Sequence, residues 1–484
     1  MSPDPHYARR WLILAVLAVA QLMVVLDATI VNIALPSAQA SLGFSDDSRQ
    51  WIVTAYALAF GSLLLLGGRL SDLFGRKWMF VAGLAGFSLA SAAGGAAQSF
   101  EMLVGARALQ GLFGAILAPS SLALLSVTFT DPAERRRATG VYGAIAGGGG
   151  AVGLLLGGLL TEYLSWRWCL YVNLGFAIPA ALAALRLLHH QPVAVKPRLD
   201  LPGVATASAG LFALVYGFSH AETDGWAAGL TLAALAAGGL LLTVFVAIQR
   251  RASHPLLPLR VITDRNRAGA YVAVAVAGAG MFGMFLFLTY YLQQTLGFSP
   301  VEAGCAFLPL TAALLVGVGI TSAKLLPRVG PRPAVALGML LASTGMLVLT
   351  QLTVDSSYVT GVLPGLLLVG FGLGPTMASV MAGATLGVRP ADAGVASAMV
   401  NTGQQIGGSI GTALLSTLSA SAVTGYLDGR TQTADVLAQA SVHGYTTAFW
   451  ISAAIFAAGA VVCGALLRPG VPRTEHGAEP VMAH

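Results

Sequence analysis

The stretch Gly67-Gly68-Arg69-Leu70-Ser71-Asp72-Leu73-Phe74-Gly75-Arg76-Lys77 is a short polar segment between two long apolar runs, 49–67 and 78–97. Its glycines permit a tight turn, because glycine adopts positive φ without steric cost. Part of the pattern returns in the second half of the chain, at Lys324, Leu325, Gly330 and Arg332. A second pair of similar segments, separated by nearly the same interval, is Pro132-Ala133-Glu134 and Pro390-Ala391-Asp392. Together these two repeated patterns predict that the second half of the chain is a duplicate of the first.

The composition is that of a membrane protein. Of the 484 residues, 56% are hydrophobic and only 10% are charged, against roughly 25% in soluble proteins. So few charged side chains cannot solvate the surface of soluble domains of this total length. The net charge of +6 does not indicate nucleic acid, because basic residues collect in the cytoplasmic loops of membrane proteins. The three cysteines lie far apart and predict neither a disulfide framework nor a metal site.

Fourteen apolar runs are long enough to cross a membrane, since a spanning helix needs about 20 mostly apolar residues. They lie at 11–35, 49–67, 78–97, 102–127, 138–159, 167–187, 201–219, 227–248, 268–292, 300–323, 334–352, 358–382, 394–420 and 446–467. If the N-terminus is cytoplasmic, all 26 basic residues except Arg49, Arg107, Arg167 and Arg430 fall on the cytoplasmic side. This asymmetry predicts a multi-pass protein of the cell membrane with both termini in the cytoplasm.

The duplication predicts the domain organisation. We expect an all-α polytopic membrane protein with two pseudo-symmetric six-helix bundles, at 1–190 and 267–468. Residues 191–266 contain linkers and an inserted pair of helices, and 469–484 form a cytoplasmic tail that is expected to be disordered. Internal repeats of this kind are a usual plan of secondary transporters.

Asp27 is the one carboxylate that we place well inside a predicted span. A charge there costs at least about 2.5 kcal/mol, so an acid within the membrane is a functional candidate by default. Burial disfavours the charged form of a carboxyl, which suits a group that must gain and lose a proton. The alternative is a buried acid that only pairs with a neighbouring helix.

Arg107 lies in the fourth predicted span and shares one helix face with Gln110, Gly111 and Gly114, at spacings of three, four and seven. An arginine does not lose its charge at accessible pH, so it could tune a carboxylate but could not carry a proton. The alternative is a side chain that snorkels to the membrane surface.

The loop 67–77 has a functional and an ordinary interpretation. Gly68, Asp72, Gly75 and Arg76 could stabilise one conformation of the protein, because Asp72 can pair with an arginine or a helix N-terminus. An ordinary cytoplasmic loop would explain the basic residues, but not the aspartate or the glycine spacing. The glycines of the fifth span, Gly153, Gly157 and Gly158 among them, indicate close helix packing and a possible bend.

A polar and aromatic set of residues forms the candidate lining of a substrate cavity. The predicted span 394–420 carries an amide face at Asn401, Gln404 and Gln405, which could equally bond helices together. The predicted span 268–292 carries an aromatic cluster, and aromatic residues are more often packing or interfacial groups. The full candidate list is Gln21, Asp27, Gln110, Phe282, Phe285, Tyr290, Asn401, Gln404 and Gln405.

Other energy sources are disfavoured. The sequence contains no G-x-x-x-x-G-K-[ST] nucleotide-binding motif, no cluster of metal ligands and no nucleophile–base arrangement. We therefore expect a transporter and not an enzyme, with no cofactor, no metal and no nucleic-acid partner.

Four stretches give the chain, from about Arg10 to Arg468, a resemblance to the fourteen-helix drug/proton antiporter branch of the major facilitator superfamily. The helix 1 signature resembles Leu26-Asp27-Ala28-Thr29-Ile30-Val31-Asn32-Ile33-Ala34-Leu35-Pro36. The loop motif resembles Gly68–Lys77, and the helix 4 motif resembles Arg107-Ala108-Leu109-Gln110-Gly111. The antiporter motif of helix 5 resembles Gly153–Gly158, followed by Trp166-Arg167-Trp168.

The resemblance implies two bundles that rock about a central site and exchange drug export for inward proton flow. It implies that Asp27 takes part in proton coupling with help from Arg107, and that Asp72 and Arg76 stabilise the outward-facing state. The chain departs from the pattern at Leu154 and at Gly175, where these motifs usually have proline. Leu154 would weaken the helix 5 bend or shift it into 147–150.

The sequence therefore favours a monomeric, proton-gradient-driven exporter of small amphipathic drugs or a secondary metabolite, within a lipid bilayer. A single acid predicts monocationic or neutral substrates, and Asn401 and Gln404 argue against dications. An uptake symporter or an uncoupled facilitator on the same fold is the first alternative. A receptor without transport is the second, and it leaves Asp27, Arg107 and the repeat unexplained.

Overall fold

The computed structural model describes residues 5–46, 48–188, 200–385, 388 and 392–470. Within these ranges the chain folds into helices, and fourteen of its helical segments are long and apolar enough to cross a membrane. The predicted count of spans and the all-α fold class are confirmed. The linker 191–199 and the tail from 471 onward lie outside the described residues.

The N-terminal bundle contains the first six helices, which are α1 (Pro5–Leu42), α2 (Gln50–Phe74), α3 (Arg76–Gly95), α4 (Phe100–Thr128), α5 (Pro132–Tyr163) and α6 (Trp168–Leu187). Side chains cap several of their N-termini. Ser99 accepts a hydrogen bond from the backbone of Met102 at the start of α4, and Asp131 accepts two at the start of α5. Such caps satisfy N–H groups that have no partner within the helix.

The inserted pair is α7 (Leu201–Asp224) and α8 (Gly229–Arg251). The short helix α9 (Leu259–Thr263) leads from it into the C-terminal bundle. That bundle consists of α10 (Arg265–Tyr290), α11 (Pro300–Ala306), α12 (Leu308–Ile320), α13 (Leu326–Val329), α14 (Pro331–Leu349), α15 (Leu363–Thr385), α16 (Ala393–Leu427) and α17 (Ala434–Leu466). Short π-helical turns at Tyr291–Thr295, Thr321–Leu325 and Tyr358–Val362 continue α10, α12 and the start of α15.

The helix pairings repeat between the two bundles. In the N-terminal bundle α1 packs on α5 and α6, α2 on α4, and α3 on α4 and α6. The equivalent pairs in the C-terminal bundle are α10 with α16 and α17, α12 with α15, and α14 with α15 and α17. The bundles meet mainly through two pairs that are also equivalent, α2 with α16 and α5 with α11. The duplication predicted from the repeated sequence patterns therefore extends to the helix pairs that pack together in each bundle.

Gly75 and Gly330 show the same duplication at the level of the backbone. Gly75 ends α2 with φ of 93°, and Gly330 ends α13 with φ of 79°. L-residues with side chains rarely adopt such φ values. The glycine that the sequence pattern repeats is therefore the residue that lets each loop turn into the next helix.

Several helices are longer than the apolar runs that predicted them. The run 11–35 lies in the 38-residue α1, and the run 394–420 lies in the 35-residue α16. The reason is that hydropathy marks only the part of a helix that faces lipid, whereas backbone hydrogen bonds continue it into polar sequence. The run 300–323 is divided between α11, α12 and the following π-helical turn, since Phe307 interrupts the regular helix.

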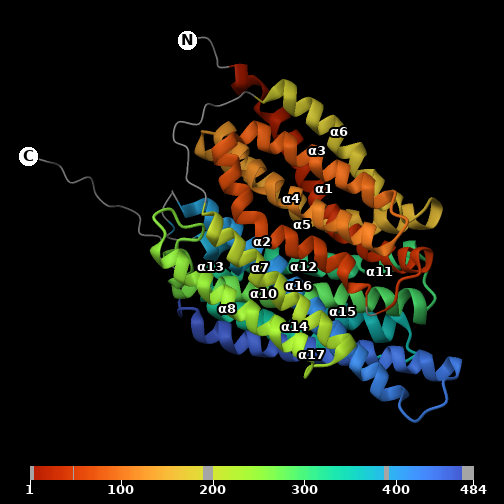
Figure 1. The fold of residues 1–484 in the computed structure, drawn as a ribbon. Coiled ribbons are helices and arrows are strands. Elements are labelled where there is room, and N and C mark those ends of the chain that lie inside the picture. Colours follow the sequence, from red (N-terminus) through yellow and green to blue (C-terminus); the bar gives the residue numbers. More distant parts are fainter. Residues whose placement is uncertain (1–4, 47, 189–199, 386–387, 389–391, 471–484) are drawn as a thin grey trace, which may run out of the picture.

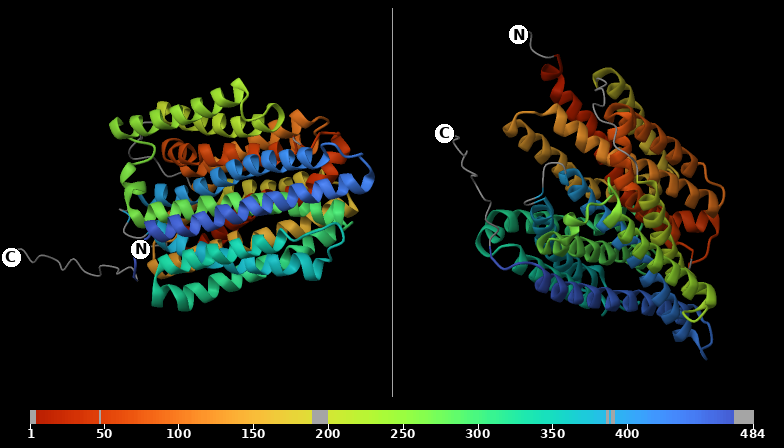
Figure 2. Two further views of the ribbon diagram at one scale, coloured as in Figure 1. Left: turned by 90° about the horizontal axis from the view of Figure 1, so that it is seen from below. Right: turned by 60° about the vertical axis from the view of Figure 1, so that its left-hand side comes forward.

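Both ends of the described chain lie at one end of the bundle, because an even number of spans separates the start of α1 from the end of α17. We call this the proximal end and the opposite one the distal end. Figure 1 shows the red-to-orange helices of the N-terminal bundle on one side and the green-to-blue C-terminal bundle on the other. Figure 2 shows α7 and α8 at the edge of the assembly, where α7 packs on α2 and α16.

Candidate functional site

Asp27 lies within α1 and is fully buried, with 0% of its surface exposed. Its carboxylate accepts three side-chain hydrogen bonds. Arg107 Nη1 donates to Oδ2 at 2.5 Å, and Gln110 Nε2 and Asn173 Nδ2 donate to Oδ1 at 2.9 and 2.7 Å. Because Arg107 and Gln110 come from α4 and Asn173 from α6, this acid connects three helices. We call these four residues the acid network.

Arg107 points into the bundle and not toward its surface, since only 2% of it is exposed. Its Nε donates to the backbone carbonyl of Ile52 in α2 at 3.2 Å, and its Nη1 also donates to Gln110 Oε1 at 3.0 Å. The guanidinium carbon lies 4.4 Å from the centroid of the Tyr56 ring, a cation–π contact. The charge of Arg107 is therefore compensated by an acid, two oxygens and an aromatic ring.

Ser91 of α3 is hydrogen-bonded to both amides of the acid network. Its hydroxyl oxygen accepts hydrogen bonds from Gln110 Nε2 at 3.0 Å and from Asn173 Nδ2 at 2.9 Å. Its own O–H donates to the carbonyl of Leu170 in α6 at 2.8 Å. Each amide thus directs one N–H at Asp27 and the other at Ser91, which fixes the plane of both amides.

The glycines of α4 and α5 permit the close helix approach that brings these groups together. A Cβ at Gly111 would lie 2.4 Å from the backbone oxygen of Tyr56. On α5, a Cβ at Gly153 would lie 2.1 Å from Thr29 Oγ1, and one at Gly157 would lie 2.9 Å from the Ile30 carbonyl. The contacts of Gly153 and Gly157 flank Asp27 on α1, so α5 packs against the helix that carries the acid.

Gly158 and Leu154 of α5 face the other bundle. A Cβ at Gly158 would lie 2.6 Å from the carbonyl of Pro300, and one at Gly304 would lie 2.5 Å from the carbonyl of Leu154. Leu154, where the sequence departs from the antiporter motif, is 1% exposed. The motif glycines thus pack α5 against α1 on one side and α11 on the other.

The predicted conformational loop lies at the proximal end. The predicted loop 67–77 is shorter in the structure, because α2 continues to Phe74 and α3 begins at Arg76, which leaves Gly75 alone between them. Asp72, in the last turn of α2, and Arg76, at the start of α3, are 3.7 Å apart and partly exposed. Gly75 supplies the positive φ already described, whereas a Cβ at Gly68 would meet only Pro119, at 3.7 Å. Arg69 reaches beyond the loop and donates to the carbonyl of Pro255 at 3.0 Å.

The predicted cavity residues are spread over several parts of the fold. Asp27 and Gln110 belong to the acid network, and Gln21 accepts a hydrogen bond from the Tyr142 hydroxyl at 2.6 Å, on the proximal side of it. Phe285 is buried against Phe307, at 5.0 Å between ring centroids. Phe282 is half-buried and faces Gly408 of α16.

The amide face of α16 is graded in exposure. Asn401 is exposed, Gln404 is half-buried and Gln405 is buried. Gln405 packs on α2, because a Cβ added at Gly61 of α2 would lie 3.0 Å from the Cβ of Gln405. Gln405 therefore lies in the contact between α16 and α2, whereas the backbone carbonyl of Gln404 lies against Gly278 of α10.

Tyr290 lies where the two bundles touch at the distal end. Its hydroxyl donates to Gln39 Oε1 of α1 at 2.5 Å, and Gln293 Nε2 donates to the Ile33 carbonyl at 2.9 Å. The Arg49 guanidinium carbon lies 4.1 Å from the Tyr290 ring centroid and about 6 Å from the Phe287 and Tyr445 centroids. We call these residues, together with the hydrogen bond from Val301 N to Glu162, the distal contacts. They join the bundles at the end opposite the termini.

Ser91, Asn173 and Tyr56 were not among the sequence candidates. Asn173 is one of few polar side chains in the apolar run 167–187. It is 0% exposed, as is Ser91. Isolated amides and hydroxyls at the depth of a buried acid are the signal that could have suggested them, although only packing shows that they meet.

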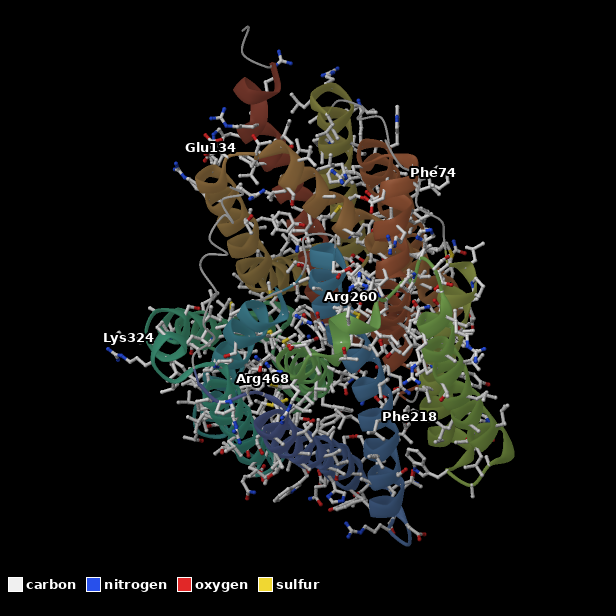
Figure 3. The ribbon with its side chains drawn as sticks, turned by 90° about the vertical axis from the view of Figure 1, so that its left-hand side faces the viewer. Phe74, Glu134, Phe218, Arg260, Lys324 and Arg468 are labelled. Carbon is white, nitrogen blue, oxygen red and sulfur yellow. The ribbon has the colours of Figure 1, made fainter. Side chains whose placement is uncertain are left out.

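Figure 3 looks onto the proximal end of the molecule. Phe74 and Glu134 lie on the N-terminal bundle, Lys324 and Arg468 lie on the C-terminal bundle, and Arg260 lies between them. Glu134 forms an ion pair with Arg10 at 2.7 Å, and Arg260 pairs with Asp392 at the same distance. The hydrogen bonds to Asp392 raise the pKa of Arg260.

Comparison with known proteins agrees with this fold. A family model described as "Major Facilitator Superfamily" matches residues 17–412. The puromycin resistance protein pur8 of Streptomyces alboniger is 49% identical over 468 residues, covering 96% of this chain and 92% of that protein. The cephamycin export protein CmcT of Amycolatopsis lactamdurans is 40% identical over 411 residues, covering 84% of each.

Solved structures share the fold at low sequence identity. A bacterial homologue of the human lysosomal transporter Spinster, in an inward-facing unoccupied conformation, has a TM-score of 0.66 at 17% identity, with 96% of this chain and 98% of that one covered. An auto-inhibited POT family peptide transporter has a TM-score of 0.68 at 16% identity, with 97% and 98% covered. The chain belongs to the Major Facilitator Superfamily. It is a multi-pass membrane transporter and not an enzyme.

Proposed function

We propose that this chain exports a small amphipathic antibiotic from the cell in exchange for protons that enter, by alternating access. The relatives named as puromycin resistance, cephamycin export and tetracenomycin C resistance and export proteins support an export role. The observation that carries the proton half of the proposal is the acid network. Asp27 of α1 is the acid, and its buried ion pair with Arg107 joins α1 to α4.

The contacts between the bundles support a state that is closed at its outer end. With the termini in the cytoplasm, as the basic residues indicate, the distal contacts lie on the outer side of the membrane. In this state Asp72 at the end of α2 pairs with Arg76 at the start of α3, so this ion pair lies within the N-terminal bundle. Opening the outer side then requires the distal contacts to separate.

Transport into inverted membrane vesicles tests the coupling. Puromycin is the first compound to use, because the relative at 49% identity is named for resistance to it. Vesicles with an imposed pH gradient, acidic inside, should accumulate puromycin when they contain the wild-type chain. Asp27→Asn should abolish this accumulation at normal expression, since the amide cannot carry a proton. Uphill accumulation by Asp27→Asn at the wild-type rate would overturn the proposal.

The single acid also sets the expected charge of the substrate. A buried site must balance the charge that it binds, or the ion stays in water. One carboxylate balances one positive charge, so monocations and neutral amphipaths are the expected substrates. One-for-one exchange of a proton for a monocation is electroneutral, whereas exchange for a neutral compound moves a charge and gains about 2.3 kcal/mol per 100 mV.

Clamping the membrane potential to zero separates these cases. With the pH gradient kept, export of a monocation should continue at nearly its full rate, and export of a neutral compound should slow. A monocation and a dication with the same ring system form a matched pair of substrates. Equal transport of both would show that a second acid serves the site.

A further inference from the structure

Asn173 and Ser91 complete the surroundings of Asp27 without carrying charge themselves. We propose that they are positioning residues that hold Asp27 in its ionised form, and so set the pH at which this acid takes up and gives up a proton. The inference rests on the proposed function, in which Asp27 is the proton carrier.

The direction of the hydrogen bonds is the first support. Asn173 Nδ2 lies 2.7 Å from Asp27 Oδ1, and Gln110 Nε2 lies 2.9 Å from the same oxygen. Both groups are N–H donors, so each bond is made to a lone pair of the carboxylate. Hydrogen bonds to the charged form of a group favour that form, and bonds to charged acceptors are stronger than neutral ones.

The oxygen of Asn173 is the second support. Asn173 Oδ1 is buried and has no hydrogen-bond partner, although buried polar atoms are normally paired. Turning the amide over would place this oxygen against the carboxylate of Asp27. The side chain therefore leaves its acceptor unused in order to donate both N–H groups, one to Asp27 and one to Ser91. This orientation stabilises an ionised acid more than a protonated one, because N–H groups bond more strongly to a charged acceptor.

Ser91 supplies the geometry that makes both donations possible. Its oxygen accepts one N–H from each amide, at 3.0 and 2.9 Å, and its O–H is used by the Leu170 carbonyl. Without the hydroxyl, Gln110 and Asn173 would each have a buried N–H with no acceptor and would be free to rotate away. Ser91 acts on Asp27 only through these two amides.

Other groups near Asp27 stay in place in both variants. The charged and titratable side chains that interact with it, from the described parts of helices around α1, are Arg107 of α4, Tyr56 of α2 and Cys169 of α6. On the α5 side, Gly153 faces Leu26 and Thr29. A change at residue 173 or 91 therefore alters the hydrogen bonds of the acid and none of these charges.

The experiment follows the protonation of Asp27 directly and needs no substrate. Infrared spectra of the purified full-length protein in lipid are recorded over a pH series, and the carboxyl band missing from Asp27→Asn is assigned to Asp27. Asn173→Leu keeps the side-chain shape and removes the donor. The midpoint of the Asp27 band should then move to more alkaline pH by about one unit, roughly a tenfold gain in proton affinity. Ser91→Ala should move it in the same direction by less.

Ser120→Ala is the matched control. Ser120 is a buried serine of α4 whose hydroxyl donates to the Ile116 carbonyl of its own helix at 2.7 Å, and its loss should leave the midpoint unchanged. Unchanged midpoints in Asn173→Leu and Ser91→Ala, with the Asp27 band present and titrating, would overturn this inference alone. A wild-type spectrum without a titrating Asp27 band would overturn the proposed function as well. If Asn173→Leu does not fold, Ser91→Ala decides.

Discussion

At the scale of the residue, the acid network is a balance of one negative and one positive charge inside a lipid-embedded bundle. Asp27 and Arg107 are both buried, and neither charge is stable there without the other. An unpaired buried charge has lost its hydration without the compensating attraction of a partner. Arg107 also donates from Nη1 to Gln110 and from Nε to the Ile52 carbonyl. Removing one charge of the pair should therefore destabilise the protein, and removing both should be tolerated far better.

Arg107→Leu should lower the unfolding free energy by about 3 kcal/mol, as for other broken buried ion pairs. The double variant Arg107→Leu with Asp27→Asn should recover most of this loss, because the isolated carboxylate is gone. Thermal unfolding of the purified proteins in detergent, combined as a double-mutant cycle, measures both effects. If the double variant is as unstable as the two single losses added together, then the pair does not interact as described.

At the scale of the element, the glycine face of α5 packs closely against α1. The close approach at Gly153 and Gly157 places the backbone of α5 next to the turns of α1 that flank Asp27. Leu154, next to Gly153, is buried, and its backbone carbonyl contributes to the contact with α11. A side chain added on the α1 side should separate the helices at the level of the acid.

Gly153→Ala should impair transport by about tenfold and destabilise the protein by about 1–3 kcal/mol, the usual cost of overpacking. The new Cβ would meet the Leu26 carbonyl at 2.9 Å as well as Thr29, and a backbone atom cannot move aside. Gly148→Ala is the control on the same helix, since a Cβ there has nothing within 4 Å. Drug accumulation in vesicles and thermal unfolding give the two readouts. Equal effects of the two variants would mean that helix propensity, and not contact with α1, explains the glycines.

At the scale of the whole molecule, we expect the distal contacts to influence which conformation is populated. Arg49 of the N-terminal bundle is inserted among aromatic rings of the C-terminal bundle, and Tyr290 bonds back to Gln39. These contacts exist only while the bundles touch at this end. A ligand or a mutation shifts such an equilibrium only through contacts that differ between the two states.

Arg49→Ala should shift the equilibrium toward the state open at the distal end by roughly 30-fold, because a desolvated cation–π contact is worth about 2 kcal/mol. Spin labels at Tyr163→Cys and Asp355→Cys, in a chain without its native cysteines, report the distance between the bundles at this end. Arg430→Ala is the matched control. Its guanidinium carbon lies 3.8 Å from the Tyr426 ring centroid within the C-terminal bundle, so its loss should not change the distances. A distance distribution unaltered by Arg49→Ala would show that Arg49 does not hold the ends together.

The sequence by itself determined the membrane class, the fourteen spans and the duplication. Hydropathy and charge asymmetry depend on how each side chain partitions between lipid and water, and this needs no tertiary contact. It also singled out Asp27 and Arg107, since a charge in an apolar run is conspicuous. It did not single out Asn173 or Ser91, because an amide or a hydroxyl in a long helix has many ordinary uses. Only the packing of α1, α3, α4 and α6 brings those groups within 3 Å of one another. Likewise, Arg49 and Tyr290 are far apart in the chain, and only the docking of two separate bundles brings that cation onto that ring.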